Sequence, residues 1–293
     1  KNDKGLHTHI SRIHKIPLAE YYVNFYQKKD KHTGKLLPFT NKTDYFDNDF
    51  SCLKNFEKWA EAAEPEEVRE YMLRQLKSRI ESKKLEYAPS HLELKLHGLP
   101  SLDIYKKHFG SYSKACSQLN IEPLYNKNLF NGFFDDNENV DSAKILIDTR
   151  EQRPLSFPKS SSLKLDFGDY AVGSTHYDYT YVDRKSEGDF KSTMTTGFDR
   201  FIKEMERVIE FDAYLFIVTE SSINKIKKNN IFGPHESNLP YVWHNMRIIA
   251  HKFPRRCQFI FSGSRSESEA LIPKLLVYGR KLWGVDLQYF LDH

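Results

Sequence analysis

Apolar and polar residues first follow a helical spacing at residues 65–84, "PEEVREYMLRQLKSRIESKK". Val68, Met72, Leu76 and Ile80 recur on one face of this segment, as in an amphipathic helix. Proline at the start, glutamate in the first turn and lysine in the last turn suit the two helix ends. The segment is therefore predicted to be a helix that buries one face.

Three shorter helices are predicted after it. Each begins at a serine that can cap its first turn, and a glycine ends the first two. These residues are Ser90, Gly98, Ser101, Gly110 and Ser111. Residues 65–123 are thus predicted to form a small helical region, with the tight turns typical of a helix-turn-helix module. A structural bundle with a solvated, charged face fits the pattern equally well.

From residue 143 to 293 the pattern changes to alternating strands and helices. "KILI", "AYLFIVT" and "CQFIFSG" are apolar runs of strand length, whereas "GFDRFIKEMERVIEF", "YVWHNMRIIAHKF" and "SESEALIPKLLVYGRKLW" have helical spacing. The apolar face of the first of these helices is predicted to comprise Phe198, Phe201, Ile202, Met205 and Ile209. The alternation predicts an α/β domain with a mixed central sheet flanked by helices.

The N-terminal residues 1–64 are polar and irregular apart from one motif, "GLHTHISRIHKI", in which four residues separate His9 from His14. This spacing matches the histidine half of a Cys2His2 zinc finger. No cysteine pair precedes it, so two surface histidines on a helix is the preferred interpretation. Zn²⁺ binding is expected only in a longer parent chain, and the start at Lys1 rather than Met indicates a fragment or a processed product.

Residues 124–142, "LYNKNLFNGFFDDNENVDS", are predicted to be a linker, because Asn, Asp and Gly dominate them. Phe130, Phe133 and Phe134 within this segment are candidates to dock on a neighbouring domain. The linker would separate the helical region from the α/β domain.

Composition narrows the classes of function. The 293 residues carry a net charge of +4, which permits a nucleic-acid partner without requiring one. No apolar run is long enough to span a bilayer and no signal peptide is visible, so no membrane partner is expected. Three scattered cysteines indicate free thiols in a reducing compartment. The sequence shows no P-loop or dinucleotide fingerprint, and therefore no visible means of hydrolysing ATP.

Acidic residues collect at the ends of strands predicted for the α/β domain. They are Asp148 and Glu151 after "KILI", Asp169 after "LKLDFG", and Asp183 at the end of "YTYV". Ligands of open α/β sheets usually bind at strand ends. Because residues two apart on a strand share a face, Asp183 and Lys185 are expected to project together, with Arg184 on the other side.

A hairpin can bring Asp169 beside Asp183, where the two carboxylates repel each other unless a cation lies between them. Mg²⁺ prefers such oxygen ligands, and Lys185 could stabilise the charge of a phosphodiester under attack. Two carboxylates followed by x-Lys is the active-site pattern of the PD-(D/E)xK nucleases. Taken alone, "DRK" is more simply explained as a salt-bridged surface turn, because such triplets arise by chance in many chains.

Three ordered segments, "IDTREQRPL", "LDFGDYAVG" and "YVDRKSEGDF", together resemble the nuclease domain of the XPF/Hef family. That family shows an acidic-x-Arg-Glu segment, a Gly-Asp turn, and Glu-Arg-Lys followed by Asp. The matching residues are Asp148, Arg150, Glu151, Gly168, Asp169, Arg184, Lys185 and Asp189. Asp183 stands where the family has Glu, so this shorter carboxylate must reach further. The resemblance implies a restriction-endonuclease-like fold for residues 143–293.

The resemblance also implies Mg²⁺ or Mn²⁺ as the cofactor. Asp169 and Asp183 would hold the metal, with Glu151 and Asp148 as further ligands or as groups that orient the water. Lys185 would stabilise the developing phosphorane charge, while Arg184 and Asp189 would support the strand–helix junction or contact phosphate. Arg150 and Arg200 are assigned to contacts with DNA. The family implies a homodimer through the nuclease domain, and the apolar C-terminal stretch "LLVYGRKLWGVDLQYFLDH" suits either an interface or a core.

Upstream, "YAPSHLELKLHGLPSLDIYKKHFGSYSKACSQLNIEP" resembles the homing endonuclease-associated repeat, a helix-turn-helix unit. Its phosphate-facing residues would be Lys106, Lys107, Ser111, Ser113 and Lys114. Recognition modules placed before a nuclease domain are typical of phage and bacterial site-specific nucleases. This arrangement implies double-stranded DNA as the partner and the cytoplasm of a bacterial or phage-infected cell as the location.

The predicted function is therefore a metal-dependent endodeoxyribonuclease, site-specific and of the homing type. Two alternatives stay open. One is a structure-specific nuclease that cuts flapped or branched DNA, as the XPF/Hef resemblance suggests. The other is a DNA-binding protein with a degenerate nuclease domain, which the aspartate at position 183 favours.

Overall fold

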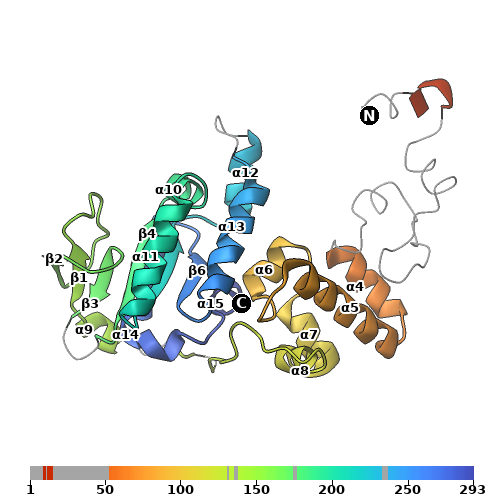
Figure 1. Cartoon of the computed structure of the whole chain (residues 1–293), viewed down its shortest axis with the longest axis horizontal. Helices are drawn as coiled ribbons and strands as arrows, with labels where there is room; N and C mark the ends of the chain where they lie inside the picture. Colours follow the sequence, from red (N-terminus) through yellow and green to blue (C-terminus); the bar gives the residue numbers. More distant parts are fainter. Residues whose placement is uncertain are drawn as a thin grey trace. The chain divides into compact units, whose positions relative to one another are not determined.

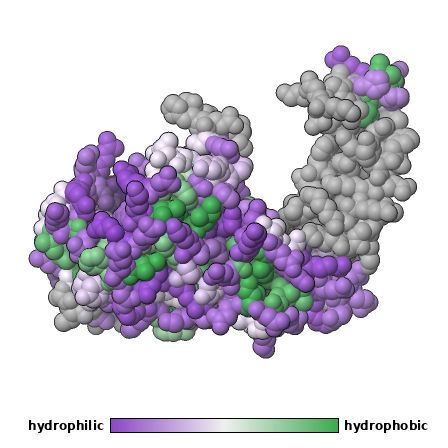
Figure 2. Space-filling model, viewed as in Figure 1, coloured by the Kyte–Doolittle hydropathy of each residue, from purple (hydrophilic) through white to green (hydrophobic). Residues whose placement is uncertain are grey.

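The structure is a computed structural model, and it describes residues 9–10, 12–15, 53–130, 132–134, 138–173, 177–232 and 237–293. The chain divides into two compact units, Lys1–Glu122 and Pro123–His293. The face shown in Figure 2 is largely hydrophilic, with hydrophobic side chains in separate patches. Within the described residues, every helix is too short or too polar to cross a membrane.

The first unit is helical. Its described helices include α4 (Leu53–Ala62), α5 (Pro65–Lys83), α6 (His91–Leu96), α7 (Leu102–Phe109) and α8 (Tyr112–Ser117). The hydroxyls of Ser90 and Ser111 cap α6 and α8 as predicted, whereas the Ser101 side chain makes no cap hydrogen bond. A core of apolar side chains, among them Met72 and Tyr105, holds α5–α8 together.

Helix α4 lies in a segment where the sequence pattern predicted irregular structure. The ring of Phe56 is buried and stacks on that of Tyr71 in α5 at 5.8 Å between centroids. Trp59 contacts the same tyrosine at 5.0 Å. These aromatic residues, three apart in the sequence, form a helical face that the surrounding Asn and Asp residues obscured in the sequence.

The second unit confirms the predicted α/β class. Its described strands are β1 (Ile145–Asp148), β2 (Ser160–Leu163), β3 (Tyr170–Val172), β4 (Thr180–Lys185), β5 (Tyr214–Thr219) and β6 (Cys257–Phe261). They form one sheet in the order β2-β1-β3-β4-β5-β6. Strands β4, β5 and β6 run parallel, and β3 is antiparallel to both of its neighbours, so the sheet is mixed.

Helices cover both faces of this sheet (Figure 1). They are α9 (Glu138–Ser142), α10 (Glu187–Thr193), α11 (Phe198–Glu210), α12 (Ile223–Phe232), α13 (Leu239–Lys252), α14 (Arg265–Tyr278) and α15 (Leu287–Asp292), with a 3-10 turn at Gly279–Leu282. On one face, α14 packs against Val182 and Phe216. On the other, Phe190 of α10 and Trp243 of α13 contact the Phe261 ring.

Three sequence predictions need correction or refinement. The strand expected over "LKLDFG" is instead β2 at Ser160–Leu163, because Leu165 turns inward and the chain bends at Gly168. In α11 the buried face comprises Phe201, Met205 and Val208, whereas Ile209 is 41% exposed. The C-terminal apolar stretch supplies buried residues to the core of this unit.

The segment predicted to be a linker packs onto the second unit. The amides of Asn126 and Lys127 donate to the carbonyl of Gly284. Phe133 and Phe134 dock against the ring of Tyr278, as expected, but Phe130 stays exposed. Backbone pairing and ring contacts together make this segment part of the α/β unit.

Candidate active site

Strand β4 places Asp183 and Lys185 on one face of the sheet, as the period of two predicted. The Lys185 ammonium lies 2.8 Å from a carboxylate oxygen of Asp183. It also lies over the ring of Phe201 in α11, at 5.5 Å from the centroid. Both side chains therefore point toward the face covered by α11.

Gly168 brings Asp169 beside this pair. Its φ is +59°, and a Cβ added there would lie 2.6 Å from the carbonyl oxygen of Val182 in β4. The next amide, of Asp169, donates to that same carbonyl at 2.8 Å. The Asp169 carboxylate then accepts the amide of Arg184 at 2.8 Å. The Gly-Asp pair is thus required for close approach of the two chain segments.

Replacing Gly168 by alanine should destabilise the protein by about 2–3 kcal/mol, because alanine disfavours this φ and its methyl group would meet backbone. Urea unfolding of the variant measures the loss. Gly188→Ala is the control, since a Cβ at Gly188 would meet only the Ser186 hydroxyl, at 3.9 Å. Equal stability of Gly168→Ala and the wild type would contradict the close approach.

Asp183 is buried, Asp169 is half-buried, and Lys185 is the cation that pairs with Asp183. Burial and the neighbouring Asp183 raise the pKa of Asp169 to about 8. Burial alone would lower the pKa of Lys185, but Asp183 and Asp169 outweigh it and raise that pKa above its usual value. One lysine between two aspartates leaves negative charge uncompensated, which is a reason for a cation to bind.

A further carboxylate, Glu204 of α11, faces the same cleft and was not predicted. Burial and then Asp183 raise its pKa. Its side chain makes no hydrogen bond or ion pair with any residue that the structure describes. The sequence did hold a signal, because Glu204 is three residues after Phe201 and four before Val208 and so shares their inward face.

These side chains line a cleft of about 420 Å³. Its lining comprises Asp148, Arg150, Asp166, Gly168, Asp169, Asp183, Lys185, Arg200, Lys203, Glu204 and Arg207. Acidic groups lie toward the interior, and the helix α11 supplies exposed cations, Arg200, Lys203 and Arg207. Neither Arg200 nor Lys203 forms an ion pair with a described residue. Cations without an ion-pair partner at the entrance of an acidic cleft are suited to bind the phosphates of a nucleic-acid backbone.

Asp148 lines the cleft, but its carboxylate is already occupied. It accepts from the Arg150 amide at 2.7 Å, from the Arg150 guanidinium at 2.7 and 2.9 Å, and from the Leu165 amide at 2.7 Å. Burial would raise the pKa of Asp148, but these hydrogen bonds lower it below its usual value. Asp148 thus positions Arg150 and the loop before Asp169.

The structure does not bring Glu151 or Arg184 into the cleft. The Arg184 guanidinium forms ion pairs with Glu151 at 3.1 Å and Glu220 at 3.0 Å. Because Arg184 alternates with Asp183 on β4, this ion-pair cluster lies on the α14 face of the sheet. Arg265 at the start of α14 joins it through Glu220 at 3.3 Å. The predicted metal-ligand role of Glu151 and the predicted phosphate contact of Arg184, which was also among the candidate catalytic residues, have no geometric support here.

Asp189 completes the N-terminal cap of α10. Its amide donates to the Ser186 hydroxyl at 3.2 Å, and its carboxylate accepts from that hydroxyl at 2.6 Å. The two hydrogen bonds join the first turn of α10 to its N-cap residue Ser186, directly after β4. Asp189 therefore supports the strand–helix junction, one of its two predicted roles.

Asp169 and Asp183 are the residues that fit a divalent cation. Mg²⁺ is typically held by one or two carboxylates, with water and phosphate oxygens at its other positions. Lys185 pairs with Asp183, whereas the Asp169 carboxylate accepts the neutral amide of Arg184, so a cation would add positive charge beside Asp169. No group of three or more His, Cys, Asp or Glu side chains within the described ranges is arranged to hold a metal ion.

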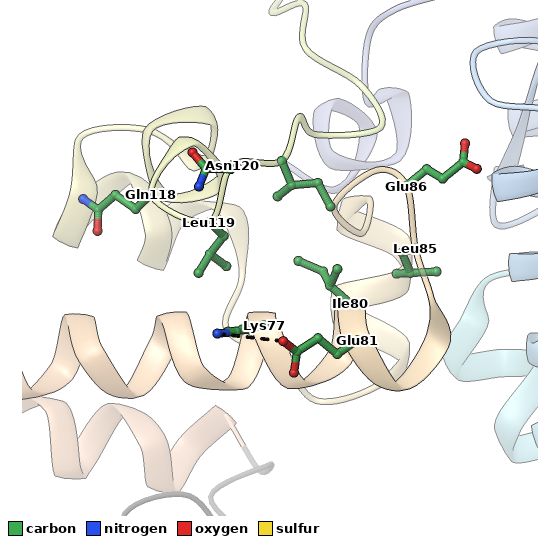
Figure 3. A pocket seen from close by; sticks show the side chains of 9 residues that line it. Lys77, Ile80, Glu81, Leu85, Glu86, Gln118, Leu119 and Asn120 are labelled. Atoms are coloured by element: carbon green, nitrogen blue, oxygen red, sulfur yellow. Dashed lines mark ion pairs between the residues drawn. The ribbon is translucent and has the colours of Figure 1, made fainter.

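The predicted DNA-contacting residues of the first unit lie on α7 and α8. Lys106, Lys107, Ser113 and Lys114 are exposed, whereas the Ser111 hydroxyl accepts the Lys114 amide as a helix cap. A separate hollow of about 420 Å³ lies between α5 and the residues after α8 (Figure 3). Its lining is partly apolar, with a Lys77–Glu81 ion pair at 3.8 Å, and includes none of the predicted contact residues.

At the histidine motif, the rings of His9 and His14 lie 5.1 Å apart between centroids. Several neighbours of the motif lie outside the described residues. The prediction of Zn²⁺ binding in a longer chain therefore stays a prediction.

Comparison with known proteins gives one kind of match. No protein-family model and no curated protein matches this chain. Among solved structures it is similar to XPF from Aeropyrum pernix in complex with DNA, with a TM-score of 0.35 and 18% identity over 47% of this chain and 66% of that one. It is also similar to a second structure of XPF from Aeropyrum pernix, with a TM-score of 0.36 and 17% identity. That match covers 47% of this chain and 61% of the other. The chain thus spans less than two thirds of either structure.

Proposed function

We propose that this chain is a divalent-metal-dependent endonuclease that hydrolyses phosphodiester bonds of DNA. The observation that supports this most directly is the Asp169–Asp183 pair, of which Asp183 is buried and Asp169 half-buried, with Lys185 beside it in a cleft bordered by Arg200 and Lys203. Two carboxylates that share one lysine at a partly buried position are costly to the fold, so they indicate a functional site.

The residues of the cleft divide the proposed reaction among them. Mg²⁺ or Mn²⁺, held by Asp169 and Asp183, would supply Lewis-acid stabilisation of the phosphate charge. Lys185, held by Asp183, keeps a second positive charge where the pentacovalent phosphorus becomes more negative. Glu204 has a raised pKa and forms no hydrogen bond or ion pair with a described residue, which suits a group that accepts the proton of the attacking water. Arg200 and Lys203 would bind the flanking phosphates.

We further propose that the first unit makes cleavage site-specific. The exposed Lys106, Lys107 and Lys114 on two short helices support this, since such helices can present side chains to a DNA groove. The alternative is a structure-specific nuclease that recognises flaps or branches. A DNA-binding protein without catalytic power is the third possibility, because Asp183 is one methylene shorter than the glutamate of the family that the motifs resemble.

A cleavage assay distinguishes these functions. The protein is incubated with plasmid DNA bearing varied inserts and with a labelled flap duplex, in Mg²⁺, Mn²⁺ or EDTA. Discrete fragments from one insert support the site-specific enzyme, and cuts confined to the flap junction support the structure-specific one. DNA binding without Mn²⁺ binding or cleavage would identify the degenerate domain. Cleavage undiminished in EDTA would reject metal dependence.

A further inference from the structure

Helix α12 carries a cationic surface that the cleft does not use. Lys225, Lys227 and Lys228 are exposed, and the helix, "INKIKKNNIF", contains no acidic residue. Ile223 and Ile226 are buried on its opposite side. At 100° per residue the three lysines span an arc of about 160°, in which Lys225 and Lys228 face away from these isoleucines and Lys227 flanks Ile223.

The charges on this arc do not stabilise the helix. None of the three lysines pairs with an acidic group in the part of the chain that the structure describes. Lys225 and Lys228 are three apart, where like charges repel. Lys225 also lies in the first turn, at the positive end of the helix dipole. A negatively charged binding partner would offset both the repulsion between these lysines and the unfavourable position of Lys225 at the helix dipole.

The position of α12 relates this surface to the active site. Strands β4 and β5 are parallel, with Lys185 opposite Thr219, and the Glu220 amide donates to the Lys185 carbonyl at 2.9 Å. The chain enters α12 three residues after Glu220, so α12 begins at the same edge of the sheet as the cleft. Figure 1 shows α10 and α12 toward the same end of this unit.

Glu187, two residues after Lys185, connects α12 to the active-site strand. Its carboxylate accepts from Asn229 of α12 at 2.8 Å and from Ser221 at 3.4 Å, and it pairs with Lys191 at 2.8 Å. These contacts hold α12 against α10, the helix that follows the catalytic strand. The lysines are thereby presented by an anchored helix.

We propose that the Lys225–Lys227–Lys228 surface of α12 binds backbone phosphates of the same duplex DNA that enters the cleft, as a second contact besides Arg200 and Lys203. This inference rests on the proposed function. Phosphate is the favoured ligand because the three lysines are exposed and α12 carries no acidic residue, which suits a polyanion that passes over the helix.

The test is the triple variant Lys225→Gln/Lys227→Gln/Lys228→Gln, measured by fluorescence anisotropy with a short labelled duplex in EDTA. The dissociation constant should rise about tenfold near 100 mM salt, and the slope of log K against log salt should fall by about two to three. Its melting temperature should not drop, because the removed charges repelled one another.

A charge-matched control is Lys144→Gln/Lys159→Gln/Lys281→Gln. These lysines are exposed, and Lys144 and Lys159 precede β1 and β2, at the opposite edge of the sheet from the cleft. Lys281 lies next to Leu282 and Trp283, whose indole donates to Thr180 at the start of β4. This variant should retain most of the wild-type affinity and salt slope.

Two outcomes separate the inference from the proposed function. Equal affinity of the α12 variant and the control, with weaker binding by Arg200→Gln/Lys203→Gln, would overturn the α12 surface and leave the nuclease proposal intact. Unchanged binding by Arg200→Gln/Lys203→Gln, or no duplex binding by the wild type, would count against the DNA-binding cleft itself.

Discussion

Replacing Asp183 by asparagine should reduce DNA cleavage by about a thousandfold, because it removes one of two carboxylates placed to hold the cation. It also replaces the charged partner of the Lys185 ammonium, which lies at 2.8 Å, by a neutral amide. The change keeps the side-chain size, so the fold should survive. Single-turnover cleavage of the preferred DNA substrate, over a series of Mn²⁺ concentrations, gives the loss.

The matched control for this variant is Glu210→Gln. Glu210 is exposed at the end of α11, outside the cleft, and its replacement removes the same unit of charge. Calorimetry with Mn²⁺ adds a second measurement, in which Asp183→Asn should lose binding and Glu210→Gln should retain it. Full activity of Asp183→Asn in a protein preparation of verified purity would reject the assigned catalytic site.

Asp169→Asn should abolish cleavage to a similar degree and yet stabilise the metal-free protein. Burial and Asp183 raise the pKa of Asp169 to about 8 in the folded chain, from 3.8 for an ordinary aspartate. The folded state therefore retains a proton that the unfolded state releases, and stability falls as pH rises between these two values. Asparagine carries no charge and can still accept a hydrogen bond from the Arg184 amide. The variant should therefore not lose stability as pH rises over this range.

The free energy of unfolding of Asp169→Asn should exceed that of the wild type by about 3 kcal/mol near pH 8, and by less near pH 5. This is well below the free energy that corresponds to the full pKa shift, because a folded site relaxes and admits water. Urea unfolding in EDTA at both pH values gives the difference. Asp166→Asn, an exposed aspartate in the same loop, is the control. Added Mg²⁺ should stabilise the wild type but not Asp169→Asn. If the stability of Asp169→Asn and of the wild type changed in parallel with pH, the electrostatic argument would be refuted.

Local patterns were enough to predict the side-chain directions on β4. A strand alternates its faces, so the grouping of Asp183 with Lys185, and the separation of Arg184, followed from the order of residues. The Gly-Asp pair likewise indicated a turn, and Gly168 does adopt a positive φ. The helix caps of Ser90 and Ser111 were predictable for the same reason, since each depends on residues within one turn.

The ion-pair partners were not predictable in this way. Motif order placed Glu151 and Asp148 together as metal ligands, but each carboxylate has an arginine within hydrogen-bonding distance. Which arginine reaches which carboxylate depends on the paths of β1, β3 and β4 across the sheet. The apolar face predicted for α11 included Ile209, whereas the buried residue is its neighbour Val208. Glu204, which lies on the side of Val208, was therefore missed although Phe201 was predicted to lie on the buried face.

The sequence by itself determined the alternation of strands and helices, the mixed α/β class and the residues of the Asp169–Asp183–Lys185 group, because these follow from periodicity and from short-range motifs. Only the tertiary structure decided which charges meet. It joined α11 to β4 across the cleft, placed Glu151 with Arg184 on the opposite face, and brought α12 to the active-site edge through Glu187. Electrostatic energy depends on distance in space and on burial, and neither can be read from separation along the chain.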